Sequence, residues 1–181
     1  MEVFIYCIFI IIIICFIGIW FITNFNKYQT YIIRMNEAEA NIDATLRKRF
    51  DLLNKSIIII KTTAKIEENI MENIENLRSQ KLSNFDFDRK LYDLINEFEK
   101  YKELYPDLKQ NDNFVKIDIE LGESEAEIVA FRKYYNDIVT DYNKLVHQFP
   151  SNLVGLICRY SHKNYFDGKD MTDDDLEDFK V

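Results

Sequence analysis

One helical face in the second half of the sequence carries charged and amide side chains that could act together. Glu125, Arg132, Asn136 and Asn143 recur at intervals of seven, four and seven residues, which places them on one side of an α-helix. A carboxylate and a guanidinium two turns apart could orient a polar ligand, or they could form a structural network that fixes the alignment of helices. Each of these groups needs a hydrogen-bonding partner if the face is buried.

We predict that this face forms a structural polar network, with a carboxylate such as Asp43 from an earlier helix or Glu125 as the partner of Arg132. The predicted members are Asp43, Glu125, Arg132, Asn136 and Asn143. The alternative is a bundle margin that is wetted by solvent, and the residue pattern leaves both readings open.

The remaining reactive side chains form no catalytic or metal-binding pattern. The histidines, His147 and His162, belong to no Ser-His-Asp or Cys-His grouping, and Cys158 stands alone near the end of the chain. Cys7 and Cys15 lie in an apolar run, and the sequence has no C-x-x-C motif and no phosphate-binding loop. We therefore predict no catalytic residue, no cofactor and no metal ion, and we expect that the protein is not an enzyme.

The composition favours long helices and disfavours nucleic acid as a partner. The 181 residues include only 4 Gly and 2 Pro, too few for a sheet protein with many turns. The formal net charge is −8, whereas nucleic-acid binding needs a basic face that displaces counterions. We expect no interaction with nucleic acid.

The N-terminal segment has the length and composition of a membrane span. Residues 3–22 contain no charge, and twenty helical residues at about 1.5 Å each cover the roughly 30 Å of a hydrocarbon layer. No basic residues precede the run and no small-residue cleavage site follows it, so we predict an uncleaved single-pass anchor over residues 1–24. Basic residues such as Lys27 and Arg34 follow the span, and this bias predicts a cytoplasmic C-terminal domain.

Apolar residues at intervals of three and four predict several long helices after the span. One stripe runs from Tyr28 to about residue 64, and we place a break near Lys61-Thr62-Thr63, with one continuous rod to about residue 80 as the alternative. Ser83 followed by Asp86 resembles a capping arrangement at the start of a helix that Pro106 ends. Asn111 or Asp112 then caps the next helix.

The stripe on that next helix is the longest in the chain, and Ser124 is its one polar member. Such a stripe is typical of helices that pack nearly parallel to one another, as in coiled coils and bundles. We therefore assign its aromatic rings to a core and not to a ligand. The members are Phe114, Ile117, Leu121, Ser124, Ile128, Phe131, Tyr135, Ile138, Tyr142, Leu145 and Phe149.

Two charged segments lie outside these stripes. We expect the basic cluster Arg47-Lys48-Arg49 to contact acidic stretches of neighbouring helices, because it lies about 37 Å of helix beyond the span. Residues 156–181 end in an acidic stretch, which we predict to be a solvated tail. A docking role for Leu176 and Phe179 on a basic partner is the alternative.

Several segments together resemble the LemA family, in the order in which that family has them. They cover roughly residues 25–155 and include LRKRFDL at 46–52, YPDLK at 105–109, RKYYND at 132–137 and FPSN at 149–152. The resemblance implies one membrane span followed by a cytoplasmic antiparallel helical bundle in a bacterium. Proteins similar to this family have no established catalytic residues, so none is carried over to this chain.

These observations predict an all-α protein in which a transmembrane helix precedes an antiparallel bundle over residues 25–155, with four helices or, alternatively, three. We expect a membrane-anchored, non-catalytic scaffold or adaptor that contacts lipid through residues 3–22. Its other partner would be an unknown protein or a second copy of itself. The competing hypothesis is a ligand sensor or an enzyme whose pocket lies between the helices and uses Glu125, Arg132 and tyrosines.

Overall fold

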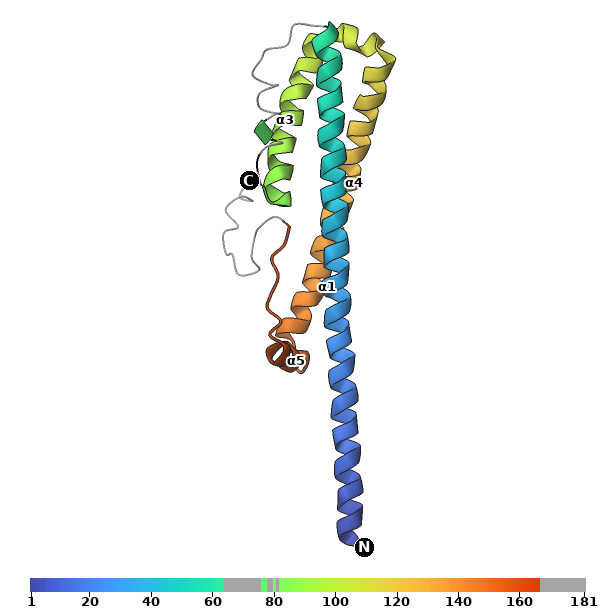
Figure 1. The fold of residues 1–181 in the computed structure, drawn as a ribbon, viewed down its shortest axis with the longest axis vertical. Coiled ribbons are helices and arrows are strands. Elements are labelled where there is room, and N and C mark those ends of the chain that lie inside the picture. Colours follow the sequence, from blue (N-terminus) through green and yellow to red (C-terminus); the bar gives the residue numbers. More distant parts are fainter. Residues whose placement is uncertain (64–75, 78–79, 81, 167–181) are drawn as a thin grey trace, which may run out of the picture. The chain divides into compact units, whose positions relative to one another are not determined.

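The computed structural model describes residues 1–63, 76–77, 80 and 82–166 of the chain. Its elements are α1 (Glu2–Thr63), α3 (Asn84–Leu104), the 3₁₀ helix η1 (Pro106–Gln110), α4 (Asp112–His147) and α5 (Ser151–Cys158), and the described residues contain no strand (Figure 1). The predicted all-α fold with a long apolar N-terminal helix is confirmed.

The described chain forms two compact units, and α1 and α4 contribute to both. The first unit contains Met1–Glu37 and Tyr135–Tyr165. The second unit contains the described part of Ala38–Tyr134, together with Phe166.

Helix α1 changes character along its length. Its apolar N-terminal window has a mean hydropathy of 3.1 and is not buried by other described residues, and its length and composition suit a membrane crossing. A buried stripe follows, which includes Tyr28, Met35, Ile42 and Ile60. Residues 64–75 lie outside the described part of the chain, so the break near Lys61-Thr63 and the choice between three and four helices stay predictions.

The helix boundaries predicted at Ser83, Pro106 and Asn111 are confirmed. The Ser83 side chain caps α3, because its Oγ accepts a hydrogen bond of 3.1 Å from the backbone N–H of Asp86. Helix α3 ends at Leu104, ahead of Pro106. The Asn111 side chain accepts hydrogen bonds from the first free N–H groups of α4, at 3.1 and 3.2 Å.

The second unit packs α4 antiparallel to α1 and α3 (Figure 1). Ring centroids of Phe98 and Phe114 lie 6.0 Å apart and join α3 to α4, and those of Phe50 and Phe87 join α1 to α3 at the same distance. Each fully buried apolar side chain contributes about 1.5–3 kcal/mol before conformational entropy is subtracted. The core of this unit is therefore apolar along most of its length.

The first unit packs the end of α4 and the short helix α5 against α1. Tyr142 and Val139 of α4 are fully buried, and the Tyr142 ring contacts Tyr28 edge-on at 5.7 Å between centroids. One member of the predicted α4 stripe needs correction. Phe149 is 80% exposed because α4 ends at His147 and the chain turns before α5.

Candidate functional site

A buried arginine on α1 begins a group of charges in the second unit. Arg49 occupies a core position between Leu46 and Leu53, and it is only 2% exposed. Its guanidinium forms an ion pair with the carboxylate of Glu125 on α4. A buried guanidinium costs much free energy unless it is paired, and the contact with Glu125, whose side chain is 41% exposed, offsets part of that cost.

A second ion pair joins α3 to α4. The Arg132 side chain donates a hydrogen bond to Oδ1 of Asp88, whose residue is 6% exposed. Burial raises the pKa of the Asp88 carboxyl above its ordinary value, although the charge and the hydrogen bond of Arg132 act in the opposite direction. The charge of Arg49 also lowers this pKa and that of Glu125 raises it, so the two ion pairs lie within electrostatic reach of each other.

We call Arg49, Asp88, Glu125 and Arg132 the charge cluster. It joins the three long helices of the second unit with two acids and two bases, so its formal charges cancel. Each carboxylate is held by a guanidinium. A network of this kind is suited to fixing the register between helices, because a shifted helix would leave a charge buried and unpaired.

Two observations show that the cluster is packed as well as paired. The Nε atoms of Arg49 and Arg132 are buried and have no hydrogen-bond partner among the described residues. The Arg132 guanidinium lies 5.8 Å from the centre of the Phe166 ring, a cation–π geometry. Because Arg49 is buried, incomplete hydrogen bonding of its guanidinium adds to the cost of removing Glu125.

The residues of the predicted polar network lie in three different places. Glu125 and Arg132 enter the charge cluster. Asp43 accepts a hydrogen bond of 2.8 Å from Arg47 on its own helix, at the surface. Asn143 lies in the first unit, where its amide exchanges hydrogen bonds of 2.8 and 2.9 Å with the backbone of Lys163. The backbone oxygen of Asn136, also in the first unit, accepts a hydrogen bond of 2.9 Å from Thr140.

Sequence reasoning missed Arg49 and Asp88 as site residues, although their spacing contained a signal. Asp88 precedes Leu91, Ile95 and Phe98 at intervals of three, four and three, so it holds a core position of α3. Arg49 holds such a position on α1. A charge at a stripe position, with an opposite charge at a stripe position of another helix, is the pattern that would have identified the cluster.

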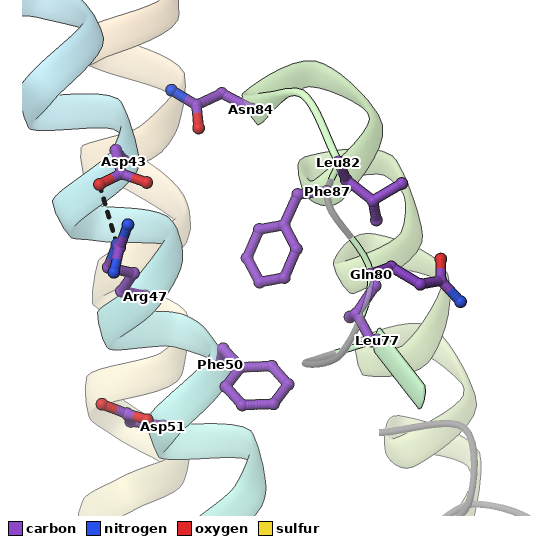
Figure 2. Close-up of a pocket in the computed structure, with 9 residues that line it drawn as sticks. All are labelled: Asp43, Arg47, Phe50, Asp51, Leu77, Gln80, Leu82, Asn84 and Phe87. Carbon is purple, nitrogen blue, oxygen red and sulfur yellow. Dashed lines mark hydrogen bonds and ion pairs between the residues drawn. The ribbon is translucent and has the colours of Figure 1, made fainter. Parts of the chain in front are cut away.

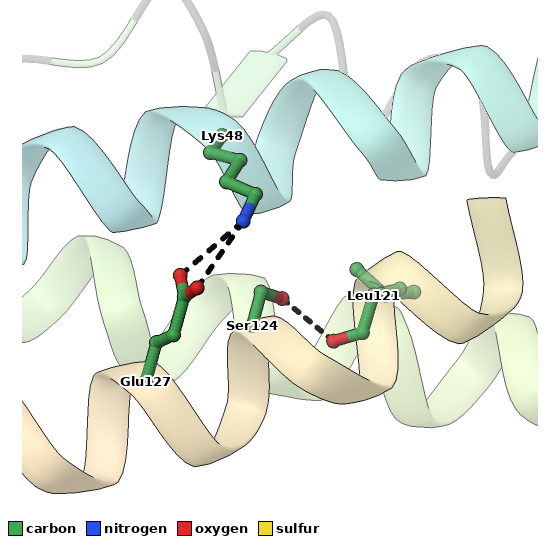
Figure 3. Close-up of polar contacts among 4 residues, drawn as sticks. All are labelled: Lys48, Leu121, Ser124 and Glu127. Carbon is green, nitrogen blue, oxygen red and sulfur yellow. Dashed lines mark hydrogen bonds and ion pairs between the residues drawn. The ribbon is translucent and has the colours of Figure 1, made fainter.

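The basic segment at 47–49 meets acidic residues of α4, as predicted for two of its members. Besides Arg49, Lys48 reaches from α1 to Glu127, with 3.3 Å between Nζ and the nearer carboxylate oxygen (Figure 3). Figure 3 also shows how the polar member of the α4 stripe is accommodated. The Ser124 hydroxyl is fully buried and donates a hydrogen bond of 2.6 Å to the backbone oxygen of Leu121.

A surface pocket of about 360 Å³ lies in the second unit. Figure 2 shows Phe50 and Phe87 between the helices, with Asp43, Arg47 and Asp51 along α1. Its volume is at the lower end of the range for small-molecule sites. This pocket does not include Glu125 or Arg132, the residues on which the predicted ligand site rested. A second pocket of about 400 Å³ is lined by Glu125, together with Tyr92 and Arg49, but not by Arg132.

The two histidine rings lie near each other in the first unit. The rings of His147 and His162 lie 6.1 Å apart between centroids. Among the described residues, no group of three or more His, Cys, Asp or Glu side chains could hold a metal ion.

The fold and the charge cluster define a class of protein. In this class a long helix is apolar at its N-terminal end, and its later part packs with two other helices around paired charges. Residues 38–177 match the model of the LemA family, and the chain belongs to this family. A comparison with curated proteins found no match.

Proposed function

We propose that the protein is a membrane-tethered helical scaffold at the cytoplasmic face of a bacterial membrane. Residues 3–22 anchor it in the bilayer. The second unit then presents helical surfaces to a protein partner or to a second copy of the chain. This role needs no catalytic residue and no cofactor.

The observation that carries the proposal is the continuity of α1. A single helix, Glu2–Thr63, contains both the unburied apolar window and the stripe that enters the core of the second unit. A helix built in this way ties a folded core to a membrane without an intervening loop. The pairing of buried Arg49 with Glu125 and of buried Asp88 with Arg132 supports a structural role for these charges.

Exposed apolar side chains of the second unit are the candidate contact points for a protein partner. Ile58, Tyr92, Ile119 and Val129 are each about half exposed, at 53%, 50%, 56% and 52%. Single exposed apolar residues are common on protein surfaces. These positions therefore serve as places for a crosslinking probe, and they do not themselves define an interface.

Photo-crosslinking in native membranes tests the scaffold role. A benzophenone amino acid replaces Ile58, Tyr92, Ile119 or Val129 in separate variants, and an exposed polar position, Glu123, serves as the matched control. We expect one or two apolar positions to give a discrete crosslinked product. In each repeat, mass spectrometry should identify the same species in that product, either one partner protein or a second copy of this chain. Equal capture of bulk membrane proteins at all five positions would contradict the scaffold role.

The ligand-sensor alternative is supported by the pocket beside Phe50 and Phe87 and by a second pocket, which Arg49, Tyr92 and Glu125 line. A screen of metabolites by thermal shift tests it, with a variant in which Phe87→Asp places a charge in the pocket as the control. A shift of the melting temperature that disappears in this variant would favour the sensor over the scaffold.

A further inference from the structure

The short helix α5 exposes apolar side chains on the face that it does not bury. Val154 and Gly155 face the interior of the first unit and are buried. On the outside, Leu156 and Ile157 are 79% and 68% exposed, and Leu153 is 44% exposed. The helix is thus apolar on both faces, which is typical of a helix that is covered by something other than water.

The position of α5 on α1 is fixed by close contacts. The Tyr28 hydroxyl donates a hydrogen bond of 2.6 Å to the backbone oxygen of Leu145, just before the turn that leads to α5. It also lies 2.9 Å from the place that a Cβ on Gly155 would occupy, so the backbone of α5 touches the tyrosine. Past the end of α5, the Tyr160 ring packs against Phe25.

These contacts place α5 beside the end of the membrane span. Phe25 and Tyr28 follow the last residue of the span, Ile22, by three and six positions, or about 4.5 and 9 Å of helix. Side chains of a helix lean towards its N-terminus, which for α1 is the direction of the bilayer. The headgroup layer of one leaflet is about 5–7 Å deep. α5 therefore lies at the depth of the lipid headgroups when residues 3–22 span the hydrocarbon.

The charges around α5 suit an anionic lipid surface. Residues 142–166 contain three basic residues, Lys144, Arg159 and Lys163, and no acidic residue, although Lys144 pairs with Asp141 just before this stretch. Residues 23–36 contain Lys27 and Arg34 and likewise no acid. Both stretches are basic although the whole chain has a net charge of −8. Basic residues next to a span attract anionic lipids.

We propose that α5 is an interfacial membrane helix that inserts Leu153, Leu156 and Ile157, together with Phe149 of the preceding turn, into the leaflet where the α1 span ends. The exposed face of α5 is covered by the anionic lipid surface of the same bilayer that holds residues 3–22. Apolar side chains flanked by lysine and arginine are the usual composition of helices that lie in this layer. The inference rests on the membrane tether of the proposed function and does not depend on the scaffold role.

Depth-dependent fluorescence quenching of the full-length chain tests this helix. In a chain with Cys7→Ser, Cys15→Ser and Cys158→Ser, single cysteines at Leu156 or Ile157 carry an environment-sensitive dye, and Ile119→Cys is the matched control because Ile119 is also exposed and apolar. The chain is reconstituted in phosphatidylcholine vesicles with and without phosphatidylglycerol. We expect shallow spin-labelled lipid to quench the dyes on α5 about twofold more than the dye at 119, and more strongly when phosphatidylglycerol is present.

A third labelled position separates this inference from the tether itself. A dye at Ile13→Cys reports whether the span is inserted, through quenching by lipid labelled deep in the acyl chain. Quenching of the dye at 13 by deep lipid label would show that the span is inserted. If the dyes on α5 are then quenched by aqueous iodide as strongly as the dye at 119, α5 is not interfacial, and only the membrane tether is supported. If protection of α5 disappears when the protein is diluted in excess lipid, the occupant is a second copy of the chain, and the inference is overturned.

Discussion

The two units differ in the charge of the polar groups that they bury. The second unit buries one charged side chain of each ion pair: Arg49, whose partner Glu125 has a side chain that is 41% exposed, and Asp88, whose partner Arg132 is 28% exposed. The polar side chains buried in the first unit include neutral groups such as Tyr142 and Ser151. The Ser151 hydroxyl, for example, lies 2.9 Å from the backbone oxygen of Leu145 and 2.8 Å from that of Gln148.

This difference has a physical consequence for each unit. Neutral hydrogen bonds to backbone oxygens contribute about 0.5–1.5 kcal/mol each, and their loss is local. Buried ion pairs contribute little net stability relative to an apolar core, but the loss of one partner leaves a charge in a poorly solvated place. We therefore expect the second unit to respond more strongly to single substitutions, and the first unit to respond to alkaline pH.

The largest effect is expected from Asp88→Ala. This change removes the hydrogen-bonded partner of Arg132 and one of the two acids near Arg49. We expect a loss of about 3–5 kcal/mol in the free energy of unfolding, measured by denaturant titration of the detergent-solubilised chain. Asp43→Ala, which removes the exposed acid paired with Arg47, is the control. Equal small losses in both variants would mean that the charge cluster is solvated and does not constrain the helices.

An alkaline titration probes the first unit. Burial, followed by the nearby Tyr142, raises the pKa of Tyr28 from 10.0 to about 12, so the folded protein favours the neutral phenol. The associated stability is fully present below pH 10 and is lost as the pH rises through about 12. We expect the stability difference between the natural chain and Tyr28→Phe to fall across this window by an amount on the order of 2 kcal/mol.

A flat difference between these two proteins across the same window would show that the Tyr28 hydroxyl is open to solvent. Tyr92→Phe is the matched control, because Tyr92 is 50% exposed.

The close contact between Gly155 and Tyr28 in the first unit predicts that a second substitution restores stability lost through a first. In Gly155→Ala the new Cβ would lie 2.9 Å from the Tyr28 hydroxyl oxygen, so we expect a loss of about 1–2 kcal/mol from overpacking. Adding Tyr28→Phe removes this oxygen and should recover part of the loss in a double-mutant cycle. Strictly additive losses would show that the two residues do not touch. Gly122→Ala, with open space at its Cβ, is the control.

The smallest effect is expected from Lys48→Ala in the second unit. Lys48 and Glu127 are both about half exposed, so solvent screens their attraction. We expect a loss of about 0–1 kcal/mol, reduced further by salt. A loss as large as that of Asp88→Ala would remove the distinction between the buried cluster and the surface pair.

Most of the fold, but only part of the charge cluster, could be predicted from the sequence. Periodic apolar residues identified the long helices, and Ser83, Pro106 and Asn111 marked boundaries because their chemistry acts on the adjacent backbone. The partner of a buried charge is set by the alignment of distant helices, which local spacing does not contain. Asp88 and Arg49 were therefore missed, and Asp43 was assigned to an interior that it does not enter.

Helix α5 shows a second limit of sequence reasoning. The predicted boundary between bundle and tail, at residues 155 and 156, falls inside this helix, Ser151–Cys158. An eight-residue helix is too short for periodicity to identify. Its placement depends on Tyr28, 123 positions away from Ser151 in the chain. The acidic residues 167–181, predicted to be a solvated tail with Leu176 and Phe179 as a docking alternative, lie outside the described part of the chain.

Cysteine labelling in membranes tests the central claim, that one helix both crosses the bilayer and enters a cytoplasmic core. In a chain without its natural cysteines, Ile13→Cys probes the span and Ile58→Cys probes an exposed position of the second unit. A membrane-impermeant maleimide should label position 58 in inverted vesicles but not in intact cells with a permeable outer layer, and position 13 only after detergent is added. Labelling of position 13 without detergent, or of position 58 in the intact cells, would contradict the account.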